Sequence, residues 1–212
     1  FQAGDEVIPY FVGQGGAEGI WYVEPWQADR RAAFIALRDA AHGNALQRQF
    51  ASVVRRSMNN QVMVNGALEG ETPLTTTFPD THLGRQLQMV ARLIHVRNTL
   101  QMQRQIFFVG LGGFDTHDNQ LADQAEQLTE LDGALAAFYA ATSEMGVANG
   151  VTTFTASEFG RTTSINGDGT DHGWGSMHFV TGGAVNGKRF YGTNPTLAAN
   201  GPDDIGQGRL IV

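Results

Sequence analysis

The stretch "QIFFVGLGG" (residues 105–113), together with the segment that follows it, decides the expected fold. Residues 105–111 form a short apolar run that two glycines close, which is the pattern of a buried, parallel strand. From residue 119 to residue 145, apolar side chains recur every three or four positions, opposite a face of Glu, Asp and Gln. This periodicity predicts a long amphipathic helix that ends at Gly146.

Further elements are expected on both sides of this strand and helix. Buried strands are predicted over residues 150–160 and 177–185, with a shorter strand at 188–192. Helices are predicted over residues 28–41, from residue 45 to about residue 60, and from about residue 81. Residues 65–80 have the Gly, Pro and Thr content of a loop. The order strand, helix, strand predicts one α/β domain over residues 1–212, with a mostly parallel sheet flanked by helices.

The overall composition excludes several classes of protein. The 212 residues carry a net charge of −7, which argues against a broad nucleic-acid-binding face. Cysteine is absent, so thiolate metal sites, cysteine nucleophiles and disulfides are excluded. No apolar stretch reaches the ~18–20 residues that span a bilayer.

Asp and His occur together in two glycine-rich turns. "GGFDTHDNQ" (112–120) carries Asp115 and His117, and "GTDHGWGSMH" (169–178) carries Asp171, His172 and His178. In open α/β sheets the carboxyl ends of the strands meet at one edge, so we expect the two turns to converge. Asp and His without Cys suit Zn²⁺, Mn²⁺ or Fe and, with more oxygen ligands, Mg²⁺ or Ca²⁺.

Simpler interpretations of these turns stay open. Short Asp and His patterns arise by chance, and "GDGTD" (167–171) is also typical of a tight turn whose carboxylates bond backbone N–H groups. Asp115 could equally cap the helix that follows it. His42, His82 and His95 lie in or beside predicted helices and are expected to be structural or exposed.

A third segment, "TASEFGRT" (155–162), adds Ser157, Glu158 and Arg161 to the same edge. Arg161 could bind an anionic group through two parallel hydrogen bonds. Glu158 could serve as a metal ligand or accept a hydrogen bond from a ligand histidine. An esterase acting through Ser157 is a weaker alternative, because the G-x-S-x-G motif is absent.

The combination of "GGFDTHDNQ", "TASEFGRT" and "NGDGTDHGWGSMHFVTGGAVNG" resembles a large uncharacterised bacterial family, domain of unknown function 1501. The resemblance implies a longer, exported protein with a twin-arginine signal and a periplasmic or extracellular location. The chain begins at Phe1 and stops inside an expected strand at "GRLIV" (208–212). We therefore expect it to be the C-terminal part of that longer protein and to form an incomplete domain.

The family is similar to the alkaline phosphatase and sulfatase superfamily. This similarity implies an alkaline phosphatase-like sheet and a divalent-metal site, with Asp115 and His117 as one ligand pair and Asp171 and His172 as another. His178 would be a further ligand. The spacings depart from the superfamily, whose first Asp and His usually stand four residues apart and whose last His lies much further downstream. The superfamily's nucleophile has no counterpart in this chain.

The function implied by the resemblance is metal-dependent hydrolysis of small phosphate or sulfate esters by the intact protein. In that interpretation Arg161 steadies the anion and Glu158 supports a ligand. The alternative is a non-catalytic exported protein that keeps the fold and acts as a binding or surface-assembly module. The two hypotheses differ in whether bound metal is accompanied by turnover.

Overall fold

The computed structural model describes residues 11–211. The chain divides into two compact units. The described part of unit 1 comprises residues 11–73 and 92–107, and that of unit 2 comprises residues 74–91 and 108–211. Within residues 11–211, no helix combines the length and apolar character that a bilayer crossing requires.

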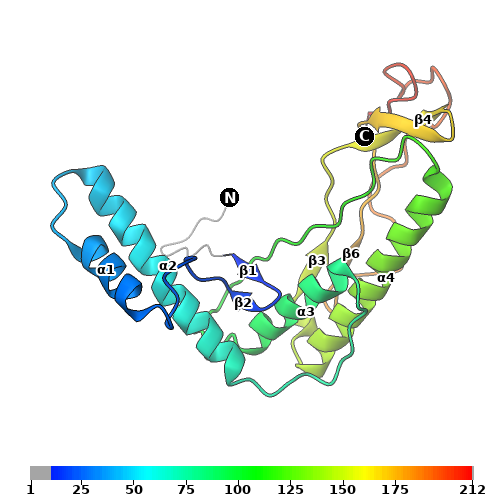
Figure 1. The fold of residues 1–212 in the computed structure, drawn as a ribbon. Helices are drawn as coiled ribbons and strands as arrows, with labels where there is room; N and C mark the ends of the chain where they lie inside the picture. Colours follow the sequence, from blue (N-terminus) through cyan, green and yellow to red (C-terminus); the bar gives the residue numbers. More distant parts are fainter. Residues whose placement is uncertain (1–10, 212) are drawn as a thin grey trace. The chain divides into compact units, whose positions relative to one another are not determined.

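Unit 1 is a helical pair with a small hairpin. Its elements are β1 (Val12–Gly13), β2 (Gly16–Ala17), α1 (Ala28–Asp39) and α2 (Ala45–Glu69), seen at the blue and cyan end of the chain (Figure 1). Helix α2 continues well past residue 60 into the segment expected to be a loop. The extra turns form because Ala67 and Leu68 are buried and the Asn65 side chain bonds both the N–H and the carbonyl of Ala17.

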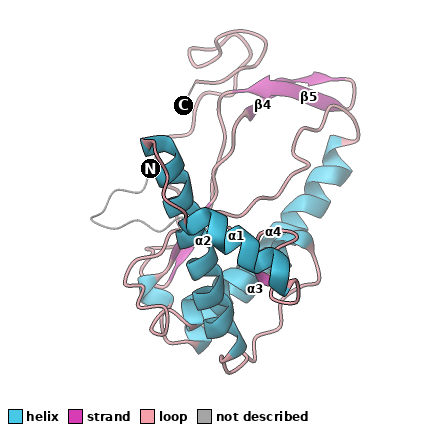
Figure 2. Ribbon diagram, turned by 60° about the vertical axis from the view of Figure 1, so that its left-hand side comes forward, coloured by secondary structure: helices cyan, strands magenta, loops and turns pink. Residues whose placement is uncertain are grey.

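Unit 2 contains one long helix, α4, and most of the strands. Its elements are the first part of α3 (His82–His95), α4 (Gln120–Glu144), the 3₁₀ turn η1 (Ala148–Gly150), β3 (Thr152–Phe154), β4 (Gly160–Asn166), β5 (Gly169–Gly173) and β6 (Val180–Gly182). Its buried apolar side chains come mainly from the two helices: Leu83, Leu87, Met89, Val90, Ala91, Ala134, Phe138 and Ala141. Loops make up much of the remainder (Figure 2).

The predicted long helix is confirmed, including its ending. Helix α4 runs from Gln120 to Glu144. Gly146 has a φ of 69°, its N–H bonds the carbonyl of Ser143, and the N–H of Val147 bonds that of Thr142. This pair of bonds is the Schellman motif, which needs a left-handed residue where the sequence supplies glycine.

The predicted parallel sheet is wrong, and with it the alkaline phosphatase-like α/β fold. Residues 11–211 form three two-stranded sheets, and all three are antiparallel. The expected strands 150–160 and 177–185 shrink to β3 and β6, which pair with each other through Thr152–Gly182 and Phe154–Val180. An apolar run shows that a segment has β propensity, but it does not specify the partner or its direction.

The apolar run 105–111 forms no strand, although its pattern suggested a buried one. Ile106 is 71% exposed and Phe108 is 98% exposed. Residues 105–107 belong to unit 1 and residues 108–111 to unit 2, so this segment links the units. Residues 188–192 are likewise not a strand, and near residue 208 there is only an isolated bridge between Asp204 and Leu210. A strand needs a continuous ladder of backbone partners. Residues 105–111 and 188–192 form no ladder within the described chain, and residues 208–211 have only a few bonds around that bridge.

The element that matters for the candidate site is the β4–β5 hairpin. Its strands pair through Arg161–His172, Ile165–Thr170 and Asn166–Gly169, with an irregular register between the first two pairs. Gly167 and Asp168 form a two-residue turn, and Gly167 has the positive φ, 69°, expected at the first position of a type II′ turn. The hairpin contacts the first turn of α4, as both ribbon views show (Figures 1 and 2).

Candidate metal centre

Two segments far apart in the sequence form the candidate site. The loop before α4 carries Asp115 and His117, and strand β5 carries His172. The two are joined because the N–H of Thr170 bonds the carbonyl of Thr116 at 3.2 Å and the N–H of Gln120 bonds the carbonyl of Asp168 at 3.2 Å. A Cβ atom on Gly169 would collide with the backbone of His117, so this close approach requires glycine.

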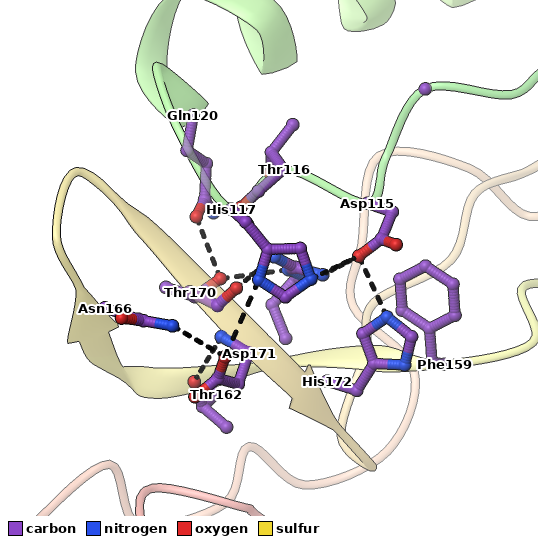
Figure 3. A network of polar contacts seen from close by, with 12 residues as sticks. Asp115, Thr116, His117, Gln120, Phe159, Thr162, Asn166, Thr170, Asp171 and His172 are labelled. Atoms are coloured by element: carbon purple, nitrogen blue, oxygen red, sulfur yellow. Dashed lines mark hydrogen bonds and ion pairs between the residues drawn. The ribbon is translucent and has the colours of Figure 1, made fainter.

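One carboxylate oxygen lies between two imidazole rings (Figure 3). Oδ1 of Asp115 is 2.8 Å from Nε2 of His172 and 3.0 Å from Nε2 of His117. The potential ligand atoms of these three residues all lie within 4.8 Å of one another. Each side chain is about half exposed, at 54%, 53% and 51% for Asp115, His172 and His117. The cluster is therefore accessible to a ligand from solvent.

The chemistry and spacing of these donors fit a divalent cation. Around a tetrahedral zinc with bonds of ~2.0–2.1 Å, neighbouring ligand atoms lie about 3.3–3.4 Å apart. The two contacts to Asp115 would have to widen by only a few tenths of an ångström to reach that spacing. One oxygen and two nitrogens form a set that zinc binds readily, whereas calcium and magnesium prefer oxygen alone.

The surroundings keep Asp115 in its charged form. The hydrogen bond with His172, followed by that from Arg161, holds the pKa of the Asp115 carboxyl below its ordinary value. A deprotonated carboxylate is the form that binds metal ions. The cluster therefore presents a charged ligand oxygen.

Asp171 takes a different position from the one expected. Its Oδ1 lies 3.6 Å from Nδ1 of His117, on the side of the ring away from Asp115, and accepts a hydrogen bond from Asn166 at 2.9 Å. A distance of 3.6 Å is too long for a hydrogen bond, so this contact is an ion pair at most. Carboxylates beside the free nitrogen of a ligand histidine commonly orient its ring. Asp171 therefore lies beside the second ring nitrogen of His117 and not among the three candidate ligand atoms.

The other predicted residues lie outside the three-residue group. Nδ1 of His178 is 3.2 Å from the hydroxyl of Thr155, and that hydroxyl also accepts the N–H of Phe179. Glu158 is exposed, and no hydrogen bond or ion pair of its side chain is found among residues 11–211. The hydroxyl of Ser157 donates to the carbonyl of Phe159 at 2.6 Å, so it is paired with backbone rather than with an imidazole.

Arg161 lies at the site, but its donors are largely occupied. One terminal nitrogen donates to Asp115 at 2.8 Å and Nε donates to the hydroxyl of Thr170 at 2.9 Å. The other terminal nitrogen donates to the carbonyls of Thr116 and Thr170. A guanidinium has five N–H groups, and four are used here. The side chain is only 15% exposed. It therefore has little left for an external anion.

Sequence reasoning missed the residues that support the cluster. The ring of Phe159 stacks on that of His172, with centroids 3.9 Å apart and planes 4° apart. The buried Thr116 and Thr170 supply the acceptors for Arg161, and Gln120 accepts from the Thr170 hydroxyl at 2.8 Å. Phe159 lies within the quoted "TASEFGRT" motif, but no spacing rule connects it to His172. The threonines carry no signal of their own.

Two further carboxylates meet beside the cluster. Asp118 and Asp168 share a hydrogen bond, which raises the pKa of Asp118 and lowers the pKa of Asp168. The backbone N–H of Asn119 also helps to lower the pKa of Asp168. This pair adds negative potential near the site.

The comparison with known proteins agrees with the family resemblance. A family model described as "Protein of unknown function (DUF1501)" matches residues 26–205. No curated protein and no solved structure matched the chain. The matched region includes all the residues of the candidate centre. The chain belongs to the DUF1501 family of proteins of unknown function.

Proposed function

We propose that Asp115, His117 and His172 bind one divalent cation and that the intact protein uses it to hydrolyse phosphate or sulfate esters. One observation carries this proposal: a single carboxylate oxygen of Asp115 meets the Nε2 atoms of His117 and of His172, which lies 57 residues after Asp115, in an exposed position. An ordinary surface ion pair brings only two charged groups together, and it does not require a third at the same point. Metal centres do.

The number of ligands favours a reactive centre over a structural one. Structural zinc sites are closed by four protein ligands, whereas catalytic sites have three and leave a position open for water or substrate. This cluster has three candidate ligands and is half exposed. A cation held there would supply Lewis acidity and an acidified water. The protein's own groups would orient the rings, through Asp171 at His117 and Phe159 at His172.

Zinc is the favoured ion, with manganese second. Two of the three donors are nitrogens, which suits ions of intermediate softness. Magnesium and calcium prefer sites with more oxygen ligands. We therefore expect competition experiments to rank zinc above both.

Reconstitution tests the proposal directly. The intact, full-length protein would be stripped with chelator, reloaded with Zn²⁺ or Mn²⁺, and assayed with p-nitrophenyl phosphate and p-nitrophenyl sulfate. We expect metal-dependent turnover that His172→Ala abolishes and that His82→Ala, an exposed histidine in α3, retains. Turnover that is unaffected by chelator and by His172→Ala would contradict the proposal.

A second candidate function is metal binding without turnover. The arrangement of Arg161 favours it, because the cation expected to bind an ester anion is committed to Asp115, Thr116 and Thr170. In this case the protein is an exported binding or surface-assembly module. Stoichiometric metal with no hydrolysis of either ester would support this alternative.

Export to the periplasm or cell surface is a separate proposal. It is supported by the family membership and by the twin-arginine signal that the resemblance implies. Sequencing the complete gene and fractionating cells that express it would test it. Recovery of the full-length product from the cytoplasm alone would contradict it.

A further inference from the structure

Residues 159–161, at and just before the start of strand β4, contact both halves of the candidate metal centre. Phe159 stacks face to face on the ring of His172 (Figure 3). Arg161, two residues later, donates to the carboxylate of Asp115. Asp115 comes from the loop before α4 and His172 from strand β5. Residues 159–161 therefore bridge the two segments that must meet for the site to exist.

The Arg161 side chain is anchored independently of Asp115. Its remaining bonds go to the hydroxyl and carbonyl of Thr170 in β5 and to the carbonyl of Thr116 in the loop. The planar guanidinium fixes these acceptors in one plane, so Asp115 is held at a defined position relative to both segments. A lysine has one charged nitrogen and cannot reproduce the fork.

Phe159 fixes the orientation of the second ligand. Its ring is parallel to that of His172 within 4°, and the Arg161 guanidinium lies 5.8 Å from its centroid. Contact over the whole ring face restricts rotation of the imidazole about the Cβ–Cγ bond of His172. Nε2 of His172 is thereby kept in the direction of Asp115, at 2.8 Å.

We propose that Phe159 and Arg161 are positioning residues that preorganise His172 and Asp115 for cation binding. This inference rests on the proposed function. Neither residue contacts the cation. Their effect is to hold the two ligands in place before binding, so that ordering them costs little when the ion arrives.

Substitutions with matched controls test the proposal by zinc titration calorimetry. Phe159→Leu and Arg161→Lys should each weaken zinc binding by about 10–100-fold, the effect usual for groups that orient metal ligands. Phe159→Tyr keeps the ring and should restore wild-type affinity. Phe154→Leu and Arg189→Lys, at exposed residues of unit 2, should leave the affinity unchanged. Melting curves would confirm that each variant is folded.

A second readout needs no metal. Stacking on Phe159 should shift the ¹H and ¹³C signals of the His172 ring, and Phe159→Leu should remove that shift in the zinc-free protein while Phe159→Tyr retains it. If the wild type binds no zinc but the shift behaves in this way, the proposed function fails and the positioning contact stands. Wild-type zinc affinity in both Phe159→Leu and Arg161→Lys, or a His172 signal indifferent to Phe159→Leu, overturns the inference.

Discussion

Nε2 of His172 lies 2.8 Å from Oδ1 of Asp115, although 57 residues separate the two in sequence. The contact exists because the β4–β5 hairpin lies against the loop that precedes α4. Asp115 also accepts from Arg161, and His117 approaches the same oxygen at 3.0 Å. The contact between the hairpin and this loop therefore determines whether Asp115 and His172 can meet.

The substitution Gly169→Ala tests the contact between the β4–β5 hairpin and the loop that carries His117. In Gly169→Ala the new Cβ would collide with the backbone of His117, so the hairpin and the loop must move apart. We expect the free energy of unfolding to fall by about 1–3 kcal/mol, as for other overpacked contacts. Chemical denaturation would measure the change. Gly187→Ala is the control, because nothing lies within 4 Å of its added Cβ. Equal stability of the two variants would count against the described contact.

Glu144 predicts a dependence of stability on pH. Its carboxylate accepts from the N–H and hydroxyl of Thr75 and of Thr76, at 2.6–2.9 Å. These bonds, led by the backbone N–H of Thr75, lower the pKa of Glu144 to about 2 from an ordinary value of 4.5. Because the folded pKa is the lower one, the stabilisation is fully present above pH 4.5 and is lost as the pH falls from there toward 2.

Substitution of Glu144 should remove this part of the pH dependence. Glu144→Gln should melt at a lower temperature than wild type at pH 7, and the difference should shrink as the pH approaches 2. Glu126→Gln, an exposed position on the same helix, is the control and should follow the wild-type curve. A constant difference between Glu144→Gln and wild type across pH 2–7 would refute the assignment.

Two glycines, one just after a helix and one inside a helix, should respond to alanine with opposite signs. Gly146 has a φ of 69°, so Gly146→Ala should destabilise the protein by about 1–2 kcal/mol, the cost of a left-handed alanine. Gly66 lies inside α2, its φ is not positive and its added Cβ meets nothing within 4 Å. Gly66→Ala should therefore stabilise by about 0.5–1 kcal/mol. Thermal denaturation of both variants would measure this, and a shift of the same sign in both would contradict the assigned helix ending.

The sequence predicts the helices well because their signals are local. The apolar periodicity of residues 119–145 and the glycine at 146 together locate α4 and its ending. The end of α2 was missed because it depends on a tertiary contact, the pair of hydrogen bonds between Asn65 and Ala17. The strands were misjudged because pairing is non-local: nothing in "QIFFVGL" (105–111) specifies a partner.

The candidate site was located more accurately than the sheet that was expected to carry it. The two Asp/His turns do converge at Asp115 and His172, yet through an antiparallel hairpin and a helix start rather than through parallel strand ends. His178 was expected among the ligands because of its residue type and its closeness in sequence to His172. Neither feature shows which way a side chain points, and its ring contacts the hydroxyl of Thr155 instead. Phe159 illustrates the opposite error, since a phenylalanine carries no ligand chemistry that would single it out. The metal roles themselves stay predictions.

Zinc titration of the chelator-stripped protein tests the central claim most directly. Isothermal calorimetry on the wild type, Asp115→Asn, His172→Ala and the exposed control Asp132→Asn would give stoichiometry and affinity. We predict one zinc per chain in the wild type and in Asp132→Asn. In Asp115→Asn and His172→Ala we predict that zinc affinity falls by more than about 100-fold. This exceeds the effect of losing a group that only orients a ligand. No zinc binding by the wild type, or equal affinity in all four proteins, would contradict the account.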